Sequence, residues 1–180
     1  MKKEVMDPFR NETKVIHADD DWAKKEGTVA PAIYYSATFT AKDSAEFAEM
    51  ATVPRHAKYY TRYGNPVHER VIEIMAQLEG TDTALVTGSG MGAIATTLLS
   101  LVKSGDHVIG QTRHYMSTAK ILDELLPRFG VETTVVEQAD ITEFEKAIQP
   151  NTKLIIIETP ANPTLVVTDI EAVVQLAKKH

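Results

Sequence analysis

The segment Ala84–Ile94 constrains the fold of this chain most, because it predicts a strand, a glycine turn and a helix in direct succession. Ala84 to Val86 form a short apolar run, which is typical of a buried strand. Residues 91–102 are nearly all apolar or small, as in a helix buried on most sides. Backbone N–H groups at a helix start have no partner within the helix, and the helix dipole favours an anion there. The segment therefore predicts a phosphate site, although a strand–helix connection with nothing bound accounts for the same residues.

Strands and helices alternate from Thr83 onward. The predicted strands cover residues 84–86, 107–109, 132–136 and 154–157, and the predicted helices cover residues 91–103, 116–129 and two later segments. Repeated strand–helix units predict an α/β fold, a mostly parallel sheet with helices on both faces. In such sheets, ligands bind beyond the carboxyl ends of the strands. The candidate site therefore lies at residues 88–90, 111–115 and 158–162.

Three details of these helices are predicted from local patterns. Asp140 with Glu143 would form a capping box that opens a short helix. Thr168 with Glu171 would form another, opening a helix through Lys179. The helix at residues 116–129 would bury four apolar side chains, Ile121, Leu122, Leu125 and Leu126.

The first 62 residues differ from the rest of the chain, because they carry polar runs and prolines and show little periodicity. They are predicted to form an arm that lies on another surface, either of its own domain or of a neighbouring subunit. A mobile terminus is the alternative. Within the arm, Asp43 would cap a short helix ending near Met50, with Phe47 and Met50 facing inward.

A helix is predicted to follow the arm. Asn65 supplies a capping side chain, Pro66 needs no N–H partner, and Gly80 closes the helix. The inward face is predicted to consist of Val67, Val71, Ile74, Met75 and Leu78. Just before the cap lie Tyr60 and Arg62. A guanidinium binds phosphate oxygens in pairs and a tyrosine hydroxyl can add a donor, so these two residues are a candidate anion site.

Composition excludes several classes of protein. The net charge is −6 with both signs mixed along the 180 residues, which disfavours nucleic acid as a partner. The chain has no cysteine, so disulfides and thiolate metal sites are excluded, and no metal site is predicted. No apolar run approaches membrane-spanning length, and no apolar segment follows the first charged residues as in a secretory signal. We therefore expect a cytoplasmic enzyme, or part of one.

The chain carries a series of short motifs, at residues 31–39, 60–66, 78–80, 89–94, 105–106, Tyr115 and residues 158–163. In this order and spacing, they resemble the Cys/Met-metabolism family of pyridoxal-phosphate (PLP) enzymes. This family includes methionine gamma-lyase, cystathionine gamma-lyase and cystathionine gamma-synthase. The resemblance implies the aspartate-aminotransferase-like fold, with an arm at residues 1–62 and a PLP-binding domain from residue 63 to 180.

The resemblance implies roles in holding the cofactor phosphate. The backbone N–H groups of Gly90 and Met91 would bind the phosphate in the same subunit. Tyr60 and Arg62 would reach the phosphate of a neighbouring subunit, which accounts for the arm. The implied assembly is a homo-oligomer, a tetramer built from dimers that share active sites.

The resemblance also implies roles at the cofactor ring. Tyr115 would stack on the pyridine ring and help to move protons at the substrate. Asn162 would donate a hydrogen bond to the phenolic oxygen of the ring, with Glu158 nearby. The family commonly has glycine after this tyrosine, whereas here Met116 follows, which leaves the substrate preference open.

The implied activity is that of a PLP-dependent lyase or transferase acting at the γ-carbon of sulfur amino acids or homoserine esters. Its partner would be a small-molecule amino-acid substrate. The family's Schiff-base lysine and the aspartate at the pyridine nitrogen correspond to positions beyond His180. We therefore expect this chain to be the amino-terminal part of such an enzyme, inactive alone.

Two other interpretations stay open. Residues 88–93 match the G-x-G-x-x-A pattern of an NAD(P)-binding oxidoreductase. However, the next predicted strand ends in Gly110 and Gln111, where that pattern requires an acidic residue. A non-catalytic truncated paralogue is the third interpretation.

Overall fold

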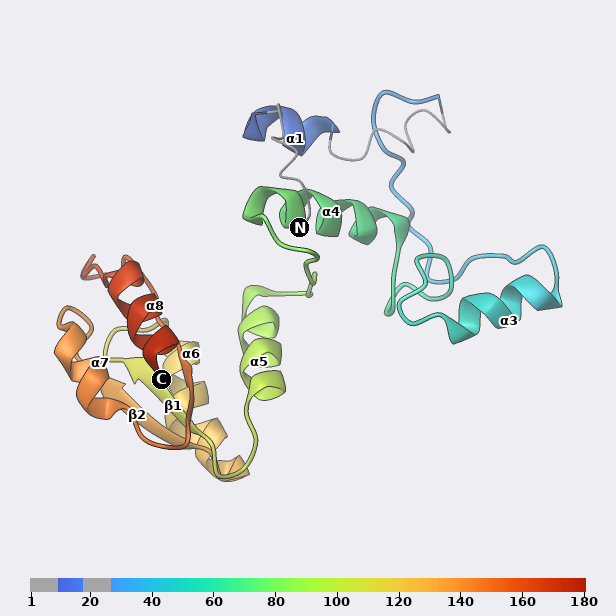
Figure 1. The fold of residues 1–180 in the computed structure, drawn as a ribbon. Coiled ribbons are helices and arrows are strands. Elements are labelled where there is room, and N and C mark those ends of the chain that lie inside the picture. Colours follow the sequence, from blue (N-terminus) through green and yellow to red (C-terminus); the bar gives the residue numbers. More distant parts are fainter. Residues whose placement is uncertain (1–9, 18–26) are drawn as a thin grey trace. The chain divides into compact units, whose positions relative to one another are not determined.

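The computed structural model describes residues 10–17 and 27–180, so parts of the predicted arm, residues 1–9 and 18–26, lie outside the described residues. The chain divides into two compact units, Met1–Val86 and Thr87–His180. Figure 1 labels most elements of both units, and each unit is described by itself below.

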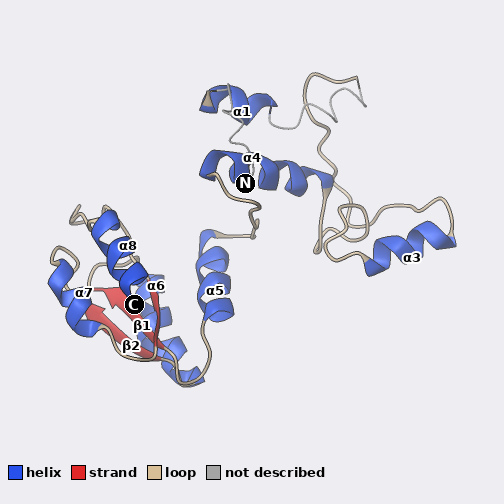
Figure 2. Cartoon of the chain, viewed as in Figure 1, coloured by secondary structure: helices blue, strands red, loops and turns tan. Residues whose placement is uncertain are grey.

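The second unit is built on three parallel strands. They are β1 (His107–Gln111), β2 (Glu132–Val136) and β3 (Thr152–Ile155), in the order β2-β1-β3, shown in red in Figure 2. β1 pairs in parallel with both neighbours, and all five of its residues are buried. The predicted parallel sheet is therefore confirmed.

Helices cover both faces of this sheet, because successive side chains of a strand point to opposite faces. Val108 packs with helix α5 (Gly90–Leu101) and the helical segment after α6 (Met116–Lys120). Ile109 packs with α7 (Ile141–Ala147) and α8 (Ile170–Lys179). Both side chains are fully buried. The structure thus confirms the predicted α/β fold with helices on both faces.

One predicted strand is wrong. Residues 84–86 have no strand structure, and Leu85 is 59% exposed. An apolar run becomes a strand only where another strand offers it a hydrogen-bonding edge, and among the described residues none pairs with this segment. The helix after it forms, and the Ser89 hydroxyl caps α5 by accepting a 3.0 Å hydrogen bond from the Gly92 N–H. It is not buried on most sides as predicted, because Leu98 is its one buried residue and Leu99 and Leu101 are nearly half exposed.

The predicted helix at residues 116–129 is helical throughout but changes its winding. After α6 come a π-helical segment, η1 (Ile121–Leu125), and a 3₁₀ turn, η2 (Leu126–Phe129). Pro127 has no N–H to continue an α-helical ladder, which accounts for the change near this point. The predicted inward residues are confirmed: Ile121, Leu122 and Leu126 are buried, and Leu125 packs against the same cluster.

Neither predicted capping box forms. The Asp140 carboxylate accepts from the Thr142 N–H, while the Glu143 side chain pairs with Lys146 at 2.6 Å. At α8 the cap is Asp169, which accepts from the Ala172 N–H. Thr168 is instead buried, and its hydroxyl donates to the Gln111 side chain, 57 positions earlier.

The first unit contains α1 (Asn11–His17), α3 (Ser44–Thr52) and α4 (Pro66–Glu79). The predicted caps are confirmed, since Asp43 accepts from the Glu46 N–H and Asn65 from the Val67 N–H. Met50 is buried as predicted, but the inward prediction for Phe47 is wrong, because its side chain is 53% exposed.

The predicted inward face of α4 is wrong at two of its five residues, while Val67, Ile74 and Leu78 are half-buried. Ile72 and Ala76 are buried, whereas Val71 and Met75 are each about 40% exposed. The buried Asn65 lies on the same face as Ile72 and Ala76, seven and eleven positions before them. Its amide donates to the Tyr34 carbonyl at 3.2 Å, so contacts outside the helix determine which face is covered.

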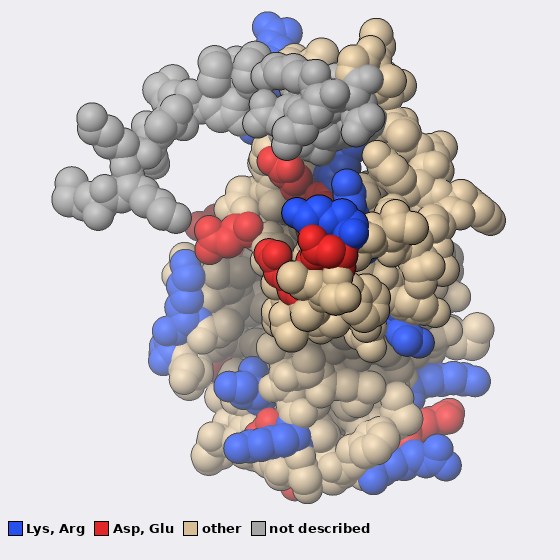
Figure 3. All heavy atoms as spheres, turned by 90° about the vertical axis from the view of Figure 1, so that its right-hand side faces the viewer, with Lys and Arg blue, Asp and Glu red and all other residues tan. Residues whose placement is uncertain are grey.

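Acidic and basic side chains lie among uncharged ones on the face of the molecule in Figure 3. None of the helices described at residues 10–17 and 27–180 is long and apolar enough to cross a membrane. Nor do these residues include a group of three or more histidine or carboxylate side chains that could hold a metal ion.

Candidate functional site

A buried amide connects the carboxyl ends of β1 and β3. Gln111, the last residue of β1, is 1% exposed. Its Nε2 donates to the Glu158 carbonyl at 2.8 Å, and its Oε1 accepts from the Glu158 N–H at 3.0 Å. The last backbone bond between these segments runs from the Ile156 N–H to the Ile109 carbonyl. The Gln111 side chain therefore continues the pairing beyond the end of the strand.

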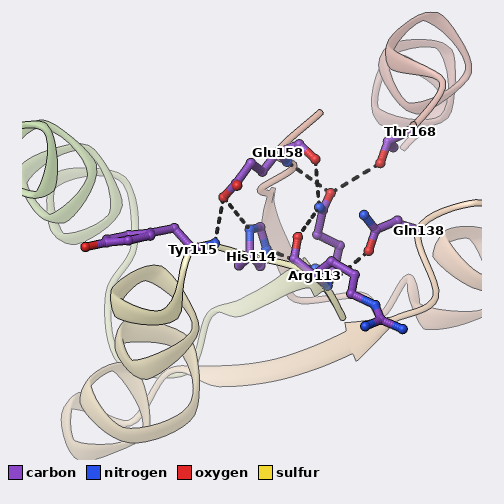
Figure 4. A network of polar contacts seen from close by, with 7 residues as sticks. Arg113, His114, Tyr115, Gln138, Glu158 and Thr168 are labelled. Atoms are coloured by element: carbon purple, nitrogen blue, oxygen red, sulfur yellow. Dashed lines mark hydrogen bonds and ion pairs between the residues drawn. The ribbon is translucent and has the colours of Figure 1, made fainter. Parts of the chain in front are cut away.

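The remaining hydrogen-bonding capacity of this amide is also used (Figure 4). Nε2 donates a second bond to the Arg113 carbonyl at 2.6 Å, and Oε1 accepts a second bond from the Thr168 hydroxyl at 3.3 Å. An amide has two donors and two acceptor sites, so all four are satisfied. Gln111 thus holds together β1, the segment after β3 and the residue before the cap of α8.

The carboxylate of Glu158 faces the segment that contains Tyr115. Its Oε2 accepts a 2.7 Å hydrogen bond from the Tyr115 N–H and lies 3.9 Å from His114 Nδ1. The His114 side chain is 2% exposed, and its Nε2 accepts from the Gln111 N–H at 3.0 Å. Because Nε2 accepts a backbone N–H, the neutral ring carries its proton on Nδ1, which faces Glu158.

Burial and charge act on His114 in opposite directions. Desolvation lowers the pKa of the imidazole, and the nearby charges of Glu158 and Asp123 partly oppose this shift. The net pKa lies below the usual value for histidine. The ring is therefore neutral at pH 7, as its acceptor role toward the Gln111 N–H requires.

Tyr115 is the residue that the family resemblance places against the cofactor ring, and its side chain is exposed. It precedes α6, and its side chain is 54% exposed. Figure 4 shows its ring pointing away from the polar network that holds its backbone. The backbone is therefore fixed while the phenol stays available to a ligand. Its assignment to the cofactor ring remains a prediction.

Asn162 lies in the same loop as Glu158, four positions later. The residue is exposed, and its side chain has no hydrogen-bond partner within residues 10–17 and 27–180. Its neighbour Ala161 is buried and forms an antiparallel bridge with Val166, which anchors the loop. The structure thus joins Glu158 to Tyr115 directly, and it connects Asn162 to them only through the chain.

The start of α5 offers free backbone donors. The Ser89 hydroxyl accepts a hydrogen bond from the Gly92 N–H, and the Thr87 hydroxyl donates to the Ser89 carbonyl at 2.8 Å. The described residues provide no partner for the N–H groups of Gly90 and Met91. A Cβ atom added at Gly90 would meet nothing within 4 Å. This open helix start fits a phosphate group.

Tyr60 and Arg62 belong to the first unit, where they form part of an aromatic cluster. The Arg62 guanidinium carbon lies 4.9 Å from the centre of the Tyr60 ring and 5.4 Å from that of Tyr63. Tyr63 in turn stacks with Tyr59. A cavity of about 560 Å³ borders this cluster. Arg62 itself is exposed, so its donors are available to an anion.

Sequence reasoning placed Gln111 and His114 within the candidate range 111–115 but gave neither a role, and it assigned Thr168 to a helix cap rather than to this network. Gln111 carried a signal, because a polar residue that ends an apolar strand needs partners when it is buried. Nothing in the sequence indicates the contacts of His114 and Thr168. Glu158 lies 44 positions after His114, and Gln111 lies 57 positions before Thr168.

Known proteins similar to this chain were found by both sequence and structure. The chain is 38% identical to L-methionine gamma-lyase of Porphyromonas gingivalis over all of its length and 45% of the relative's. It is 40% identical to cystathionine beta-lyase MetC of Bacillus subtilis, covering 94% of this chain and 41% of the relative. The chain therefore spans less than half the length of the curated relatives it matches.

Solved structures share the fold. The metB structure from Corynebacterium glutamicum superposes with a TM-score of 0.81 at 35% identity, over 96% of this chain and 43% of that one. A candidate O-acetylhomoserine (thiol)-lyase (metY) from Campylobacter jejuni gives a TM-score of 0.84 at 29% identity, over 96% of this chain and 42% of that one. That structure contains N'-pyridoxyl-lysine-5'-monophosphate.

A family model described as "Cys/Met metabolism PLP-dependent enzyme" matches residues 12–180. The match covers nearly the whole chain and agrees with the motifs, the fold and the similar proteins. The chain therefore belongs to the family of Cys/Met-metabolism PLP-dependent enzymes.

Proposed function

We propose that this protein is a PLP-dependent lyase or transferase acting at the γ-carbon of a sulfur amino acid or a homoserine ester. One observation carries the proposal most: Tyr115 has its backbone fixed by Glu158 and its phenol exposed at the carboxyl end of the sheet. The names of the relatives, methionine gamma-lyase among them, support the substrate class.

The residues present fit PLP. Gly90 and Met91 would hold the phosphate through their free N–H groups, at the positive end of the α5 dipole. The exposed Asn162 amide would donate to the phenolic oxygen of the ring. When bound, PLP supplies an electron sink for carbanions at the α- and β-carbons of the substrate.

Tyr115 would act on the substrate side of the cofactor. Its ring would stack on the pyridine, and its hydroxyl would take or give a proton at the substrate. Glu158 binds the Tyr115 backbone rather than the hydroxyl, so the phenol keeps its proton-transfer capacity. A positioned acid or base typically contributes about 10²–10⁴ in rate.

Tyr60 and Arg62 would bind the phosphate of a neighbouring subunit. The exposed guanidinium of Arg62, held against two tyrosine rings, supports this role. We accordingly propose an arm at residues 1–62, a PLP domain from residue 63, and a homotetramer in which pairs of subunits share active sites. The cytoplasmic location stays a prediction.

The nicotinamide alternative receives no support. It requires an acidic side chain at the end of β1 for the ribose hydroxyls. That position is Gln111, whose buried amide is fully occupied by protein partners. The open start of α5 is therefore assigned to the phosphate of PLP in this proposal.

The products of one substrate test the proposal. The protein expressed at its natural length is purified with PLP and given cystathionine. Cleavage at the γ-carbon releases cysteine, ammonia and 2-oxobutanoate, whereas cleavage at the β-carbon releases homocysteine, ammonia and pyruvate. We expect 2-oxobutanoate, or, with O-acetylhomoserine and a thiol, a thioether and acetate. Pyruvate as the sole keto acid, with no reaction of O-acetylhomoserine, would overturn the proposal.

A further inference from the structure

We infer that Gln111 is a positioning residue that fixes the Tyr115 segment relative to the Glu158–Asn162 segment. The inference rests on the proposed function, because these two segments would flank the cofactor ring. Gln111 itself points into the protein, 1% exposed, and does not face the site. Its action is therefore indirect, through the groups that it binds.

The Gln111 amide holds the segment after β3. Both backbone groups of Glu158 bind the Gln111 amide, at 2.8 and 3.0 Å. Two parallel bonds to one rigid amide plane fix rotation as well as distance. The segment that leads to Asn162 therefore starts from a position set by Gln111.

Gln111 also holds the segment after β1. The same amide binds the Arg113 carbonyl at 2.6 Å, and the Gln111 N–H binds His114 Nε2 at 3.0 Å. The Glu158 carboxylate also binds this segment, by accepting a 2.7 Å hydrogen bond from the Tyr115 N–H. The contacts form a closed loop from Gln111 through Glu158 to Tyr115 and back along the chain (Figure 4). Both flanks of the predicted ring site therefore depend on one side chain.

Replacing the Gln111 side chain would break this loop of contacts. Removing the amide leaves the Glu158 N–H and carbonyl without the partner that they have here. A buried polar group without a partner is costly, so this segment would shift to find new ones. A shift of the segment moves the Glu158 carboxylate away from Tyr115, and it moves Asn162 with it.

The test uses the protein at its natural length with Gln111→Met, which has nearly the same volume but no hydrogen bonds. Amide hydrogen exchange of the peptide around residues 112–118 reports on the Tyr115 N–H without any cofactor. We expect faster exchange there in Gln111→Met. We also expect the affinity for PLP to fall by about tenfold, the factor that corresponds to roughly one net hydrogen bond of lost positioning. The absorbance maximum of the bound cofactor should move.

Two further variants separate positioning from general stability. Phe144→Leu removes part of a fully buried side chain in the other cluster, and it should lower the melting temperature while leaving PLP affinity and Tyr115 exchange unchanged. Gln111→Glu keeps the acceptor and regains a donor when the buried acid is protonated. Its PLP affinity should therefore recover as the pH falls from 8 to 6, relative to the parent protein at each pH.

The two proposals fail in different ways. If the parent protein does not bind PLP, the proposed function is wrong, and the exchange data still report on Gln111. If the parent binds PLP but Gln111→Met leaves affinity, spectrum and exchange unchanged, the positioning role is wrong. Equal effects of Phe144→Leu and Gln111→Met on PLP affinity would also overturn it.

Discussion

The backbone N–H of Tyr115 donates a 2.7 Å hydrogen bond to the Oε2 atom of Glu158, a residue 43 positions later in the chain. The carboxylate thereby holds the peptide of the residue expected to do chemistry, and leaves the phenol exposed. Position and reactivity of Tyr115 are therefore set by different groups, which allows them to be tested separately.

Replacing Glu158 by alanine should lower the stability of the second unit. The Tyr115 N–H would lose a charged acceptor, which costs about 1–3 kcal/mol. Glu158→Gln, which keeps an amide oxygen as acceptor, should cost less. Urea unfolding measures both, with Glu137→Ala at an exposed position as the control. Equal stability of all three variants would show that the Glu158 bond contributes nothing.

Replacing Tyr115 by phenylalanine should separate its two expected roles in the protein at its natural length. The ring stack, worth on the order of 0.5–1.5 kcal/mol, is kept, so PLP binding should stay near normal. The hydroxyl is lost, so turnover should fall by roughly a hundredfold or more. Normal turnover of Tyr115→Phe, together with failure of Tyr115→Ala, would reduce Tyr115 to a stacking platform.

Replacing Arg62 by alanine should weaken PLP retention more than tenfold at natural length, because a charge-assisted bond to phosphate contributes about 1.5–3 kcal/mol. The oligomer should also loosen, as seen by light scattering. Arg62→Lys keeps the charge but loses the planar fork that lies near the Tyr60 and Tyr63 rings, so it should recover only part of the affinity. Unchanged PLP affinity in Arg62→Ala would count against the assignment.

Stability should fall as the pH drops below about 6.5, the ordinary pKa of histidine. Burial lowers the pKa of both His107 and His114 in the folded protein, against partial opposition from nearby carboxylates. The unfolded chain then binds more protons over this range, so stability is present above the unfolded pKa and is lost toward the lower, folded pKa. Urea unfolding between pH 7.5 and 5.5 measures the slope.

The matched variants for this pH test are His107→Gln and His114→Gln. The His107 ring bridges Thr152 and Thr134 across the sheet, at 2.8 and 2.9 Å. Each variant should be less stable at pH 7.5 but should depend less on pH. An unchanged slope in the double variant would assign the pH dependence to other groups.

Local signals in the sequence predicted the elements that depend on neighbouring residues. Asn65, Pro66 and Gly80 predicted the ends of α4 correctly, since a cap and a left-handed glycine act within one helical turn. The alternation of strand and helix segments predicted the parallel sheet correctly. Such a sheet is covered by helices on both faces, so all five residues of β1 are buried.

The predictions that failed depend on distant partners. Residues 84–86 have a strand composition but no strand to pair with in the described chain. Thr168 looked like a helix cap, yet its hydroxyl binds Gln111, 57 positions earlier. The sequence pointed to the segments after β1 and β3, which the structure brings together, but the Gln111 amide that joins them could be identified only from the three-dimensional contacts.

Val108 and Ile109, adjacent in β1, are both fully buried on opposite faces of the sheet. Inserting or deleting one residue in this strand would exchange the two faces, and it would also turn the amide of Gln111 away from Glu158. We therefore expect homologues of this chain to keep the length of β1. Alignment gaps should be rarer between Asp106 and Tyr115 than in the exposed stretch at residues 127–130.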